Sequence, residues 1–194
     1  ASCKLFLNGK RARGYAESPD YLNWSDTYPM LSADESDQAQ DELYAMRIFR
    51  YESLYLGLLK VYHVATDRCD IQLAVSRNGK HWERPHRAPL LANSPEPGSY
   101  DYGNIDEAGS PIRVGDELWF FYAGRSNLHN QPPTDTDGSL CAATLRLDGF
   151  VSLDASEEEG VLLTKPLLLQ GKALFLNADA ANGTVPARPI ITLS

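Results

Sequence analysis

The chain has 194 residues, of which 43% are hydrophobic and 23% are charged. This composition is that of a globular protein, and the length provides for one or two domains. The formal net charge is −8, and no cluster of Lys and Arg supplies the concentrated positive charge that nucleic acids and anionic membranes require. No apolar run is long enough to cross a bilayer. We therefore expect neither a nucleic-acid nor a membrane partner.

The three cysteines, Cys3, Cys69 and Cys141, are widely spaced and form no Cys-x-x-Cys or Cys/His pattern. Zinc sites need such clusters, so we expect free thiols, no structural disulfide and no metal site. A P-loop, a dinucleotide fingerprint and a Ser-His-Asp elbow are all missing, and we expect no cofactor. The first ten residues lack the long apolar core of a signal peptide. The alternatives of a secreted, periplasmic or cytoplasmic protein stay open.

The first element that the sequence predicts is a turn, and it is written twice. SPDYLNW (Ser18–Trp24) and SRNGKHW (Ser76–Trp82) both begin with Ser, have Asp or Asn two positions later, and end with Trp. Asp, Asn and Gly favour tight turns, and the Ser hydroxyl can bond the turn backbone. We predict that the Trp packs between neighbouring structural units, which makes both turns structural rather than ligand-binding.

Three later segments rich in aromatic and branched residues predict β-strands. They cover Leu54–His63, Asp70–Ser76 and Glu117–Arg125, and residues such as Gly, Pro, Asn and Asp bound them. No long segment has a clean helical period. The sequence therefore predicts an all-β protein.

An offset of 64 residues reveals a repeat, in which an acidic opening, a strand, a short turn and a strongly apolar strand follow one another. It superimposes Asp37 on Asp101, Glu42 on Asp106, Ile48 on Ile112 and Leu54 on Leu118. Trp24, Trp82 and Phe150 close successive units. Self-similarity at this spacing, with several strands in each unit, is typical of stacked propeller blades. The repeat predicts about two blades plus the tail of a third.

These segments resemble the later blades of the five-bladed β-propeller glycosidase superfamily, which includes family 32, family 43 and levansucrase. The distinctive pieces are A-x-S-R-x-G-x-x-W from Ala74 and R-L-D-G-F-x-S from Arg146. The resemblance covers roughly residues 12 to 185. It is closest to bacterial proteins with a family 32-like amino-terminal domain.

The sequence departs from this pattern in two respects. A propeller of this type has five blades, and the Asn-Asp-Pro motif that carries the nucleophile or base in the first blade is missing. The tail resembles the opening of the β-sandwich that often follows the propeller, and its alternating run KALFLNA is compatible with strands. The sequence thus predicts a partial five-bladed propeller in residues 1–160 and the start of a β-sandwich-like tail in residues 161–194.

The resemblance implies that carboxylates converge on a glycosidic bond, one as acid and the other as base or nucleophile. YDYGNI resembles the segment with the general-acid glutamate of family 32, with Asp101 as its carboxylate. Asp37 is the equivalent position of the neighbouring repeat. The family's transition-state aspartate falls near Tyr44 or Ala45, where no acid is present, and Asp37 or Glu42 is the candidate substitute.

We therefore predict Asp101 and Asp37 as catalytic residues, and we predict that the sugar is bound by Glu42, Tyr44, Tyr100, Tyr102, Arg125 and His129. The tyrosines offer faces for stacking, and Arg125 and His129 lie just beyond an apolar strand. Each has a structural alternative: Asp101 as the cap of a turn, the tyrosines as packing residues, and the two loop residues as solvated side chains.

Three functional hypotheses follow. The first is a glycoside hydrolase-like domain that acts on poly- or oligosaccharide by carboxylate acid/base chemistry, a glycosidase if it is active. The second is a non-catalytic carbohydrate-binding propeller, and the third is a protein-interaction propeller. Fold alone cannot choose among them. Because an incomplete ring exposes sheet faces and edges, we also predict self-association.

Overall fold

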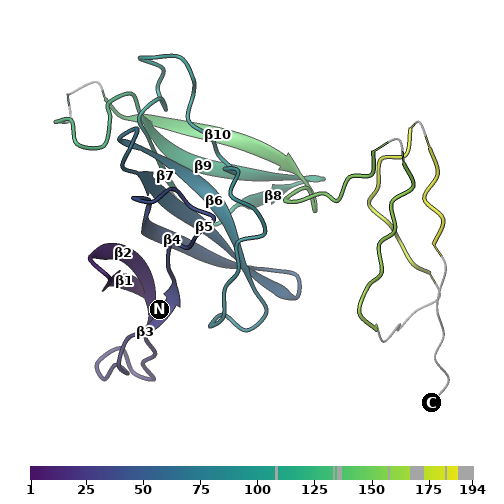
Figure 1. Cartoon of the computed structure of the whole chain (residues 1–194), viewed down its shortest axis with the longest axis horizontal. Coiled ribbons are helices and arrows are strands. Elements are labelled where there is room, and N and C mark those ends of the chain that lie inside the picture. The colour runs from purple at the N-terminus through teal and green to yellow at the C-terminus, as the bar shows by residue number, and fades with distance from the viewer. Residues whose placement is uncertain are drawn as a thin grey trace. The chain divides into compact units, whose positions relative to one another are not determined.

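The computed structural model describes residues 1–107, 109–132, 134, 137–156, 158–166, 173–181 and 183–187, and within these ranges it is all-β. The strands are β1 (Ser2–Leu7), β2 (Lys10–Tyr15), β3 (Tyr28–Leu31), β4 (Glu42–Tyr51), β5 (Leu54–His63), β6 (Arg68–Ser76), β7 (Asn104–Glu107), β8 (Ile112–Val114), β9 (Glu117–Arg125) and β10 (Ser139–Arg146) (Figure 1). The all-β prediction is confirmed. The predicted strands Leu54–His63 and Glu117–Arg125 coincide with β5 and β9.

The chain divides into two compact units, Ala1–Val151 and Ser152–Ser194. All of these strands belong to the first unit, and the described residues of the second unit contain no strand. The predicted boundary after residue 160 and the β-sandwich tail stay predictions. All three cysteines are free thiols, and the described residues contain no helix with the length and apolarity to span a membrane.

Two propeller blades make up most of the first unit. β4, β5 and β6 form an antiparallel meander, and in the next blade β7 and β8 both pair with β9, which pairs with β10. Adding 64 to the bounds of β4 gives 106–115, the stretch in which β7 ends and β8 runs. β7 and β8 together therefore replace β4 in the second blade. The parallel pair Cys69–Asn104 joins the two blades.

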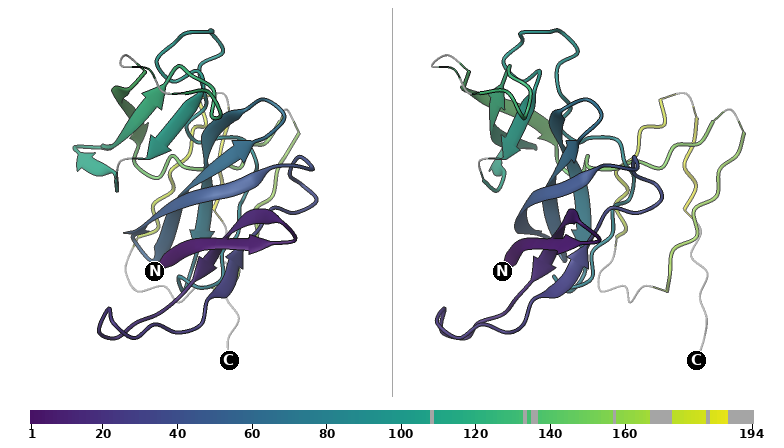
Figure 2. Two further views of the ribbon diagram at one scale, coloured as in Figure 1. Left: turned by 90° about the vertical axis from the view of Figure 1, so that its left-hand side faces the viewer. Right: turned by 60° about the vertical axis from the view of Figure 1, so that its left-hand side comes forward.

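The tail of a third blade precedes these two. β1, β2 and β3 form an antiparallel sheet, and β1 and β2 contact β4 (Figure 2). Neither this sheet nor the larger one closes on itself. The arrangement is the partial propeller that the repeat predicted.

The recurring turn has the same geometry in both copies. Oδ1 of Asp20 and of Asn78 accepts hydrogen bonds from the backbone N–H groups two and three residues later, at 2.8–2.9 Å. The indole N–H of Trp24 and of Trp82 donates to the carbonyl three residues earlier, at 3.2 and 2.9 Å. Trp82 is 7% exposed and Trp24 is 48% exposed. The packing role predicted for the tryptophan is therefore confirmed for Trp82 alone.

Two apolar cores hold the blades together. The first joins Met30 of β3 to Leu43, Leu59 and Trp82 of the next blade. The second lies between the two complete blades and includes Leu58 and Ile71 from one, with Ile105, Leu118, Phe120 and Tyr122 from the other. Because each core is shared by neighbouring blades, the ends of their strands are held side by side. Those ends carry the polar residues described next.

Candidate functional site

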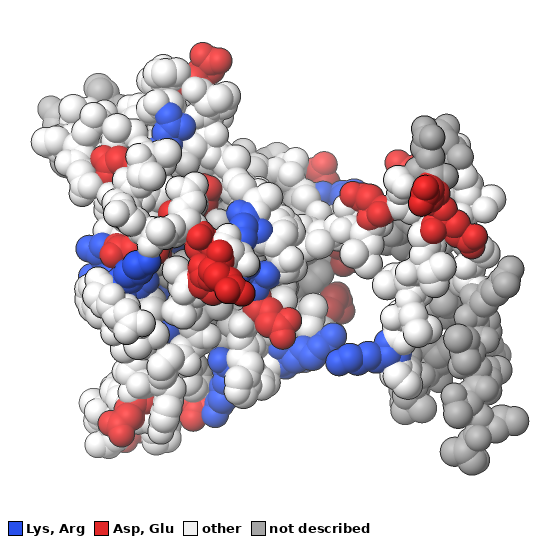
Figure 3. All heavy atoms as spheres, in the orientation of Figure 1, with Lys and Arg blue, Asp and Glu red and all other residues white. Residues whose placement is uncertain are grey.

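A cluster of polar side chains lies where β4 and β7 begin and where β5 and β9 end. Its members come from three blades and include Arg11, Glu42, Tyr44, Lys60, Asn104, Asp106, Arg125 and His129. We call this group the polar cluster. On the face drawn in Figure 3, basic and acidic side chains lie next to one another over the first unit. The charges of the polar cluster are likewise arranged as pairs.

Tyr44 lies at the centre of the polar cluster, in a β-bulge of β4. Leu43 pairs with Val61 and Ala45 pairs with Lys60, so Tyr44 is the extra residue opposite a continuous partner strand. A bulge re-aims the side chain that it carries. The backbone carbonyl of Tyr44 accepts a 2.8 Å hydrogen bond from the buried Arg13 guanidinium, which stabilises the irregular backbone.

Two ion pairs flank the tyrosine, and each joins one blade to the next. The Arg11 guanidinium pairs with Glu42 and lies 4.4 Å over the Tyr44 ring. Lys60, whose side chain is 6% exposed, pairs with Asp106, whose side chain is 43% exposed. Glu42 and Asp106 are equivalent positions of the sequence repeat, so the repeat places a carboxylate beside a cation of the preceding blade twice.

Arg125 adds a further cation on the opposite side of Asp106. Its Nε lies 4.0 Å from Asp106 Oδ2, and this Nε is buried without a hydrogen-bond partner among the described residues. Asp106 is therefore a partly exposed carboxylate between two cations. Such a carboxylate can accept hydrogen bonds from sugar hydroxyls, and the cations can donate them.

His129 follows β9 and is fixed by both of its ring nitrogens. Nε2 lies 2.8 Å from the Tyr44 hydroxyl, and Nδ1 lies 3.2 Å from Asn104 Oδ1 and 3.7 Å from Cys69 Sγ. Burial lowers the pKa of His129, and the nearby cations Lys60, Arg125 and Arg11 lower it further, while Asp67 opposes them. His129 is therefore neutral at pH 7.

The loop that carries His129 is held by the turn between β5 and β6. The backbone carbonyl of Asp67 accepts a 2.8 Å hydrogen bond from the His129 N–H, and its carboxylate accepts bonds from Asn130 and from the Tyr62 hydroxyl. Burial raises the pKa of Tyr62 to about 12, and its bond to Asp67 adds to the effect. One turn of the first complete blade thus positions a loop of the second.

The structure brings together four of the predicted site residues: Glu42, Tyr44, Arg125 and His129. Tyr100 is 56% exposed, in the loop that leads to β7. Tyr102 lies in the same loop with the Arg68 guanidinium 3.8 Å over its ring. Their role in stacking against a sugar stays a prediction.

Asp37 is bound to two arginines away from the polar cluster. Its side chain is 2% exposed and pairs with Arg84, which is 1% exposed, and with Arg87 Nε at 3.3 Å. The backbone N–H of Asp34 donates to Asp37 Oδ2 at 2.9 Å. These contacts fix the loop that leads into β4, and the catalytic role of Asp37 stays a prediction.

Asp101 is buried beside β9, with its residue 6% exposed. Oδ2 accepts a 3.0 Å hydrogen bond from the Tyr122 hydroxyl, and the Asp101 backbone carbonyl accepts one from Asn93. A Cβ added at Gly124 would lie 2.9 Å from the Cβ of Asp101, so the turn packs directly on β9. Asp37 and Asp101 share no partner among the contacts of the described residues. Among the contacts of the described residues, the carboxylate bonds the Tyr122 side chain and no backbone N–H of the turn, so the turn cap and the catalytic role of Asp101 both stay predictions.

Four members of the polar cluster were not among the predicted site residues: Arg11, Lys60, Asn104 and Asp106. Lys60 lies within the apolar strand β5, and a charge at such a position is rarely buried unless it is paired. The offset of 64 residues between Glu42 and Asp106 was the signal that pointed to Asp106. His63, at the end of β5, lies between two buried carboxylates, 3.0 Å from Asp41 and 3.1 Å from Asp70.

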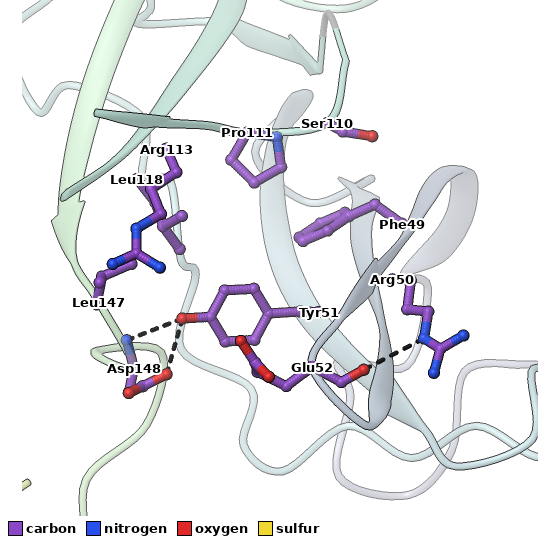
Figure 4. Close-up of a pocket in the computed structure, with 10 residues that line it drawn as sticks. All are labelled: Phe49, Arg50, Tyr51, Glu52, Ser110, Pro111, Arg113, Leu118, Leu147 and Asp148. Carbon is purple, nitrogen blue, oxygen red and sulfur yellow. Dashed lines mark hydrogen bonds between the residues drawn. The ribbon is translucent and has the colours of Figure 1, made fainter. Parts of the chain in front are cut away.

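A hollow of the first unit lies at the opposite ends of the strands. It encloses about 570 Å³ between the β4–β5 and β8–β9 hairpins and is lined by residues such as Phe49, Tyr51, Pro111 and Leu118 (Figure 4). The Tyr51 hydroxyl donates to Asp148 Oδ1 at 2.7 Å. Because the polar cluster contributes no side chain to this hollow, we treat them as separate. Among the described residues, no group of three or more His, Cys, Asp or Glu side chains is placed to hold a metal ion.

Comparisons with solved structures find proteins of similar fold that act on carbohydrates. The protein is similar to a glycoside hydrolase, with a TM-score of 0.54 and 16% identity over 79% of this chain and 42% of that one. It is also similar to β-1,2-mannobiose phosphorylase from Listeria innocua, with a TM-score of 0.52 and 19% identity over 76% of this chain and 37% of that one. No family model and no curated protein matches the sequence.

The protein therefore spans about two fifths of the length of these structures. At these identities the likeness establishes the fold alone, which is a partial propeller. The fold prediction is confirmed at this level.

Proposed function

We propose that this protein is part of a carbohydrate-acting domain of the glycoside hydrolase type, and that sugar binds over the polar cluster. The observation that carries the proposal is the gathering of Tyr44, Asp106, Arg125 and His129 from separate blades at one end of the strands. The fold supports it, because the similar structures include a glycoside hydrolase and a mannobiose phosphorylase bound to its disaccharide. A closer relation to families 32 and 43 rests on the two sequence motifs.

The polar cluster has the donors and acceptors that a sugar requires. Arg125 is a donor, Asp106 is an acceptor, and the Tyr44 ring and hydroxyl lie between two ion pairs. Hydroxyl groups are recognised by just such convergent polar groups, with aromatic faces against the apolar side of the ring. The predicted stacking residues Tyr100 and Tyr102 belong to the loop that precedes Asn104.

Hydrolysis requires two carboxylates on opposite sides of the glycosidic bond. Asp101 and Asp37 remain our predicted pair. The geometry adds Glu42 and Asp106, because both lie in the polar cluster and Asp106 is partly exposed. In the proposed function, no cofactor takes part in this chemistry.

The second candidate function, a non-catalytic carbohydrate-binding propeller, is favoured by one observation. Asp37 and Asp101 both have buried side chains whose carboxylates are engaged by Arg84 and by Tyr122, respectively. Carboxylates held in this way serve structure. A domain of this kind would bind the same sugars through the polar cluster and would not hydrolyse them.

A panel of plant and microbial oligosaccharides, with β-1,2-mannobiose included, tests the proposal by calorimetric binding and by product analysis. We expect at least one sugar to bind, and we expect Arg125→Ala and Asp106→Asn to weaken it by about 10-fold each, as for loss of a hydrogen bond to a charged group. Arg113→Ala, at the opposite strand ends, is the control. Binding without products selects the second candidate, and no binding to any sugar refutes both and favours the protein-interaction alternative.

A further inference from the structure

The hydrogen bonds from Tyr44 to His129 and from His129 to Asn104 have a defined donor and acceptor, which the orientation of the Asn104 amide determines. This residue is fully buried, and its amide orientation is determined by its partners. Asn104 Nδ2 donates to the Asn127 backbone carbonyl at 2.8 Å, so Asn104 Oδ1 faces His129. A carbonyl oxygen only accepts, so His129 Nδ1 must carry the proton that lies between them.

The tautomer of His129 then fixes the role of the Tyr44 hydroxyl. A neutral imidazole with its proton on Nδ1 has an unprotonated Nε2, which only accepts. The Tyr44 hydroxyl, 2.8 Å from Nε2, must therefore donate its proton to His129. The order of donation runs from Tyr44 to His129 to Asn104, and Asn104 in turn donates to the Asn127 carbonyl.

The β-bulge makes this arrangement possible. Leu43 is fully buried in the apolar core, and a regular strand would place Tyr44 in strict alternation with it. The extra residue breaks the alternation, and the Arg13 guanidinium donates a hydrogen bond to the backbone carbonyl of Tyr44 in the bulge. The Tyr44 ring is then held edge-on to the rings of His129 and Tyr62, at 4.8 and 5.4 Å between centroids.

We infer that Tyr44 is a specificity-determining residue whose hydroxyl oxygen, with its own proton committed to His129, accepts a hydrogen bond from a hydroxyl group of the bound sugar. His129 and Asn104 are positioning residues that set this direction of hydrogen-bond donation. The inference rests on the proposed function, and it specifies that the site recognises a sugar hydroxyl group as a hydrogen-bond donor. A sugar with hydrogen or fluorine in place of that hydroxyl cannot donate, and it leaves the tyrosine oxygen unpaired.

Protonation of His129 would reverse the direction. His129 with both nitrogens protonated would donate from Nε2 to Tyr44, and the tyrosine would then donate to the ligand. The titratable and charged groups that face His129 are Tyr44 of β4, Lys60 and Tyr62 of β5, Asp67 of the following turn, Cys69 of β6, Arg125 of β9 and Arg11 of β2. Burial and the three cations among them lower the pKa of His129, so its neutral state persists to a lower pH than that of an unperturbed histidine.

The first experiment reads the tautomer without any ligand. Long-range 1H–15N spectra of the protein with 15N-labelled histidine, assigned with His129→Gln, report which ring nitrogen is protonated. At pH 7.5 we expect His129 to be protonated on Nδ1, and we expect Tyr44→Phe to shift the Nε2 resonance without changing the tautomer. A proton on Nε2 would overturn the inference. His86, which is exposed, is the internal control.

The second experiment uses each sugar that the oligosaccharide panel identifies, with its monodeoxy and deoxyfluoro analogues. We expect one sugar position at which both analogues bind the wild type about 10-fold more weakly than the parent sugar does. For Tyr44→Phe, the same analogues should bind less than about 2-fold more weakly than the parent sugar. Tyr28→Phe, an exposed tyrosine of β3, should behave as the wild type.

The outcomes separate the inference from the proposed function. If a fluoro analogue binds as well as its parent at every position, or if Tyr44→Phe leaves all analogue ratios unchanged, the inference fails while the proposed function stands. If no sugar of the panel binds to the wild type, the proposed function fails and the inference fails with it.

Discussion

Removal of the Asp101 carboxylate provides the sharpest test of how the second complete blade is built. In Asp101→Ala the buried Tyr122 hydroxyl, 3.0 Å from Asp101 Oδ2, loses its acceptor. An unsatisfied buried polar group costs about 1–3 kcal/mol. For a unit of this size, each kcal/mol lowers the Tm by roughly 2–4 °C, so we expect a decrease of about 2–12 °C. Asp101→Asn keeps an acceptor and should cost less.

A double-mutant cycle with Tyr122→Phe isolates this contact. Each single variant leaves the other partner buried and unpaired, whereas the double variant removes both groups. We therefore expect a coupling of about 0.5–3 kcal/mol, measured by thermal or denaturant unfolding. Additive effects of the two substitutions would refute the structural role.

The same variants distinguish the catalytic role. If Asp101→Asn keeps the wild-type Tm and lowers turnover by a factor on the order of 10²–10⁴, as for the loss of a positioned acid, then Asp101 is catalytic. A lowered Tm with normal turnover for each folded molecule would leave it as the residue that fixes the turn before β7.

Three further predictions concern stability and assembly. The hydrogen bond to Asp70 raises the pKa of His63, so protonated His63 contributes stability below pH 6.5, and this stability is lost as the pH rises through the raised pKa. His63→Gln should therefore lower the Tm more at pH 5.5 than at pH 8.5, with His86→Gln as the control. An equal loss of Tm at both pH values would contradict this prediction. Trp82→Ala should cost about 3–5 kcal/mol of unfolding free energy, and Trp24→Ala in the equivalent but exposed position should cost less than half as much by denaturant titration. The exposed apolar residues of the two sheets should drive self-association of the protein. A monodisperse monomer at high concentration, measured by light scattering, would contradict this.

Local sequence patterns were sufficient for the strands β5 and β9 and for the repeat. β5 and β9 were predicted to the residue because each is a short apolar run between turn residues, and such a pattern depends on neighbours in the chain. The two Ser-to-Trp turns have the same hydrogen bonds because their Asp or Asn side chain bonds its own backbone. The offset of 64 residues correctly related β4 to β7 and β8.

Half of the polar cluster, namely Glu42, Tyr44, Arg125 and His129, was also predicted from the sequence. Arg125 ends a predicted strand and His129 follows it, and Glu42 and Tyr44 lie near the acidic opening of a repeat. The sequence could not show that Tyr44 and His129, which are 85 residues apart, share a hydrogen bond. That contact depends on how the two neighbouring blades are placed against each other, and the packing of the apolar cores decides this.

Asp37 and Asp101 show most clearly what only the tertiary structure decided. As letters in a sequence, both are acids that open equivalent repeats, and nothing local distinguishes a catalytic carboxylate from a structural one. In the folded protein Asp37 is paired with Arg84, 47 residues away, and Asp101 accepts a hydrogen bond from Tyr122, 21 residues away. A buried carboxylate takes its role from whichever donor the fold brings to it, because it cannot stay buried without one. The sequence by itself determined the all-β class, the strands β5 and β9 and the two turns, and the packing between blades decided which side chains face one another.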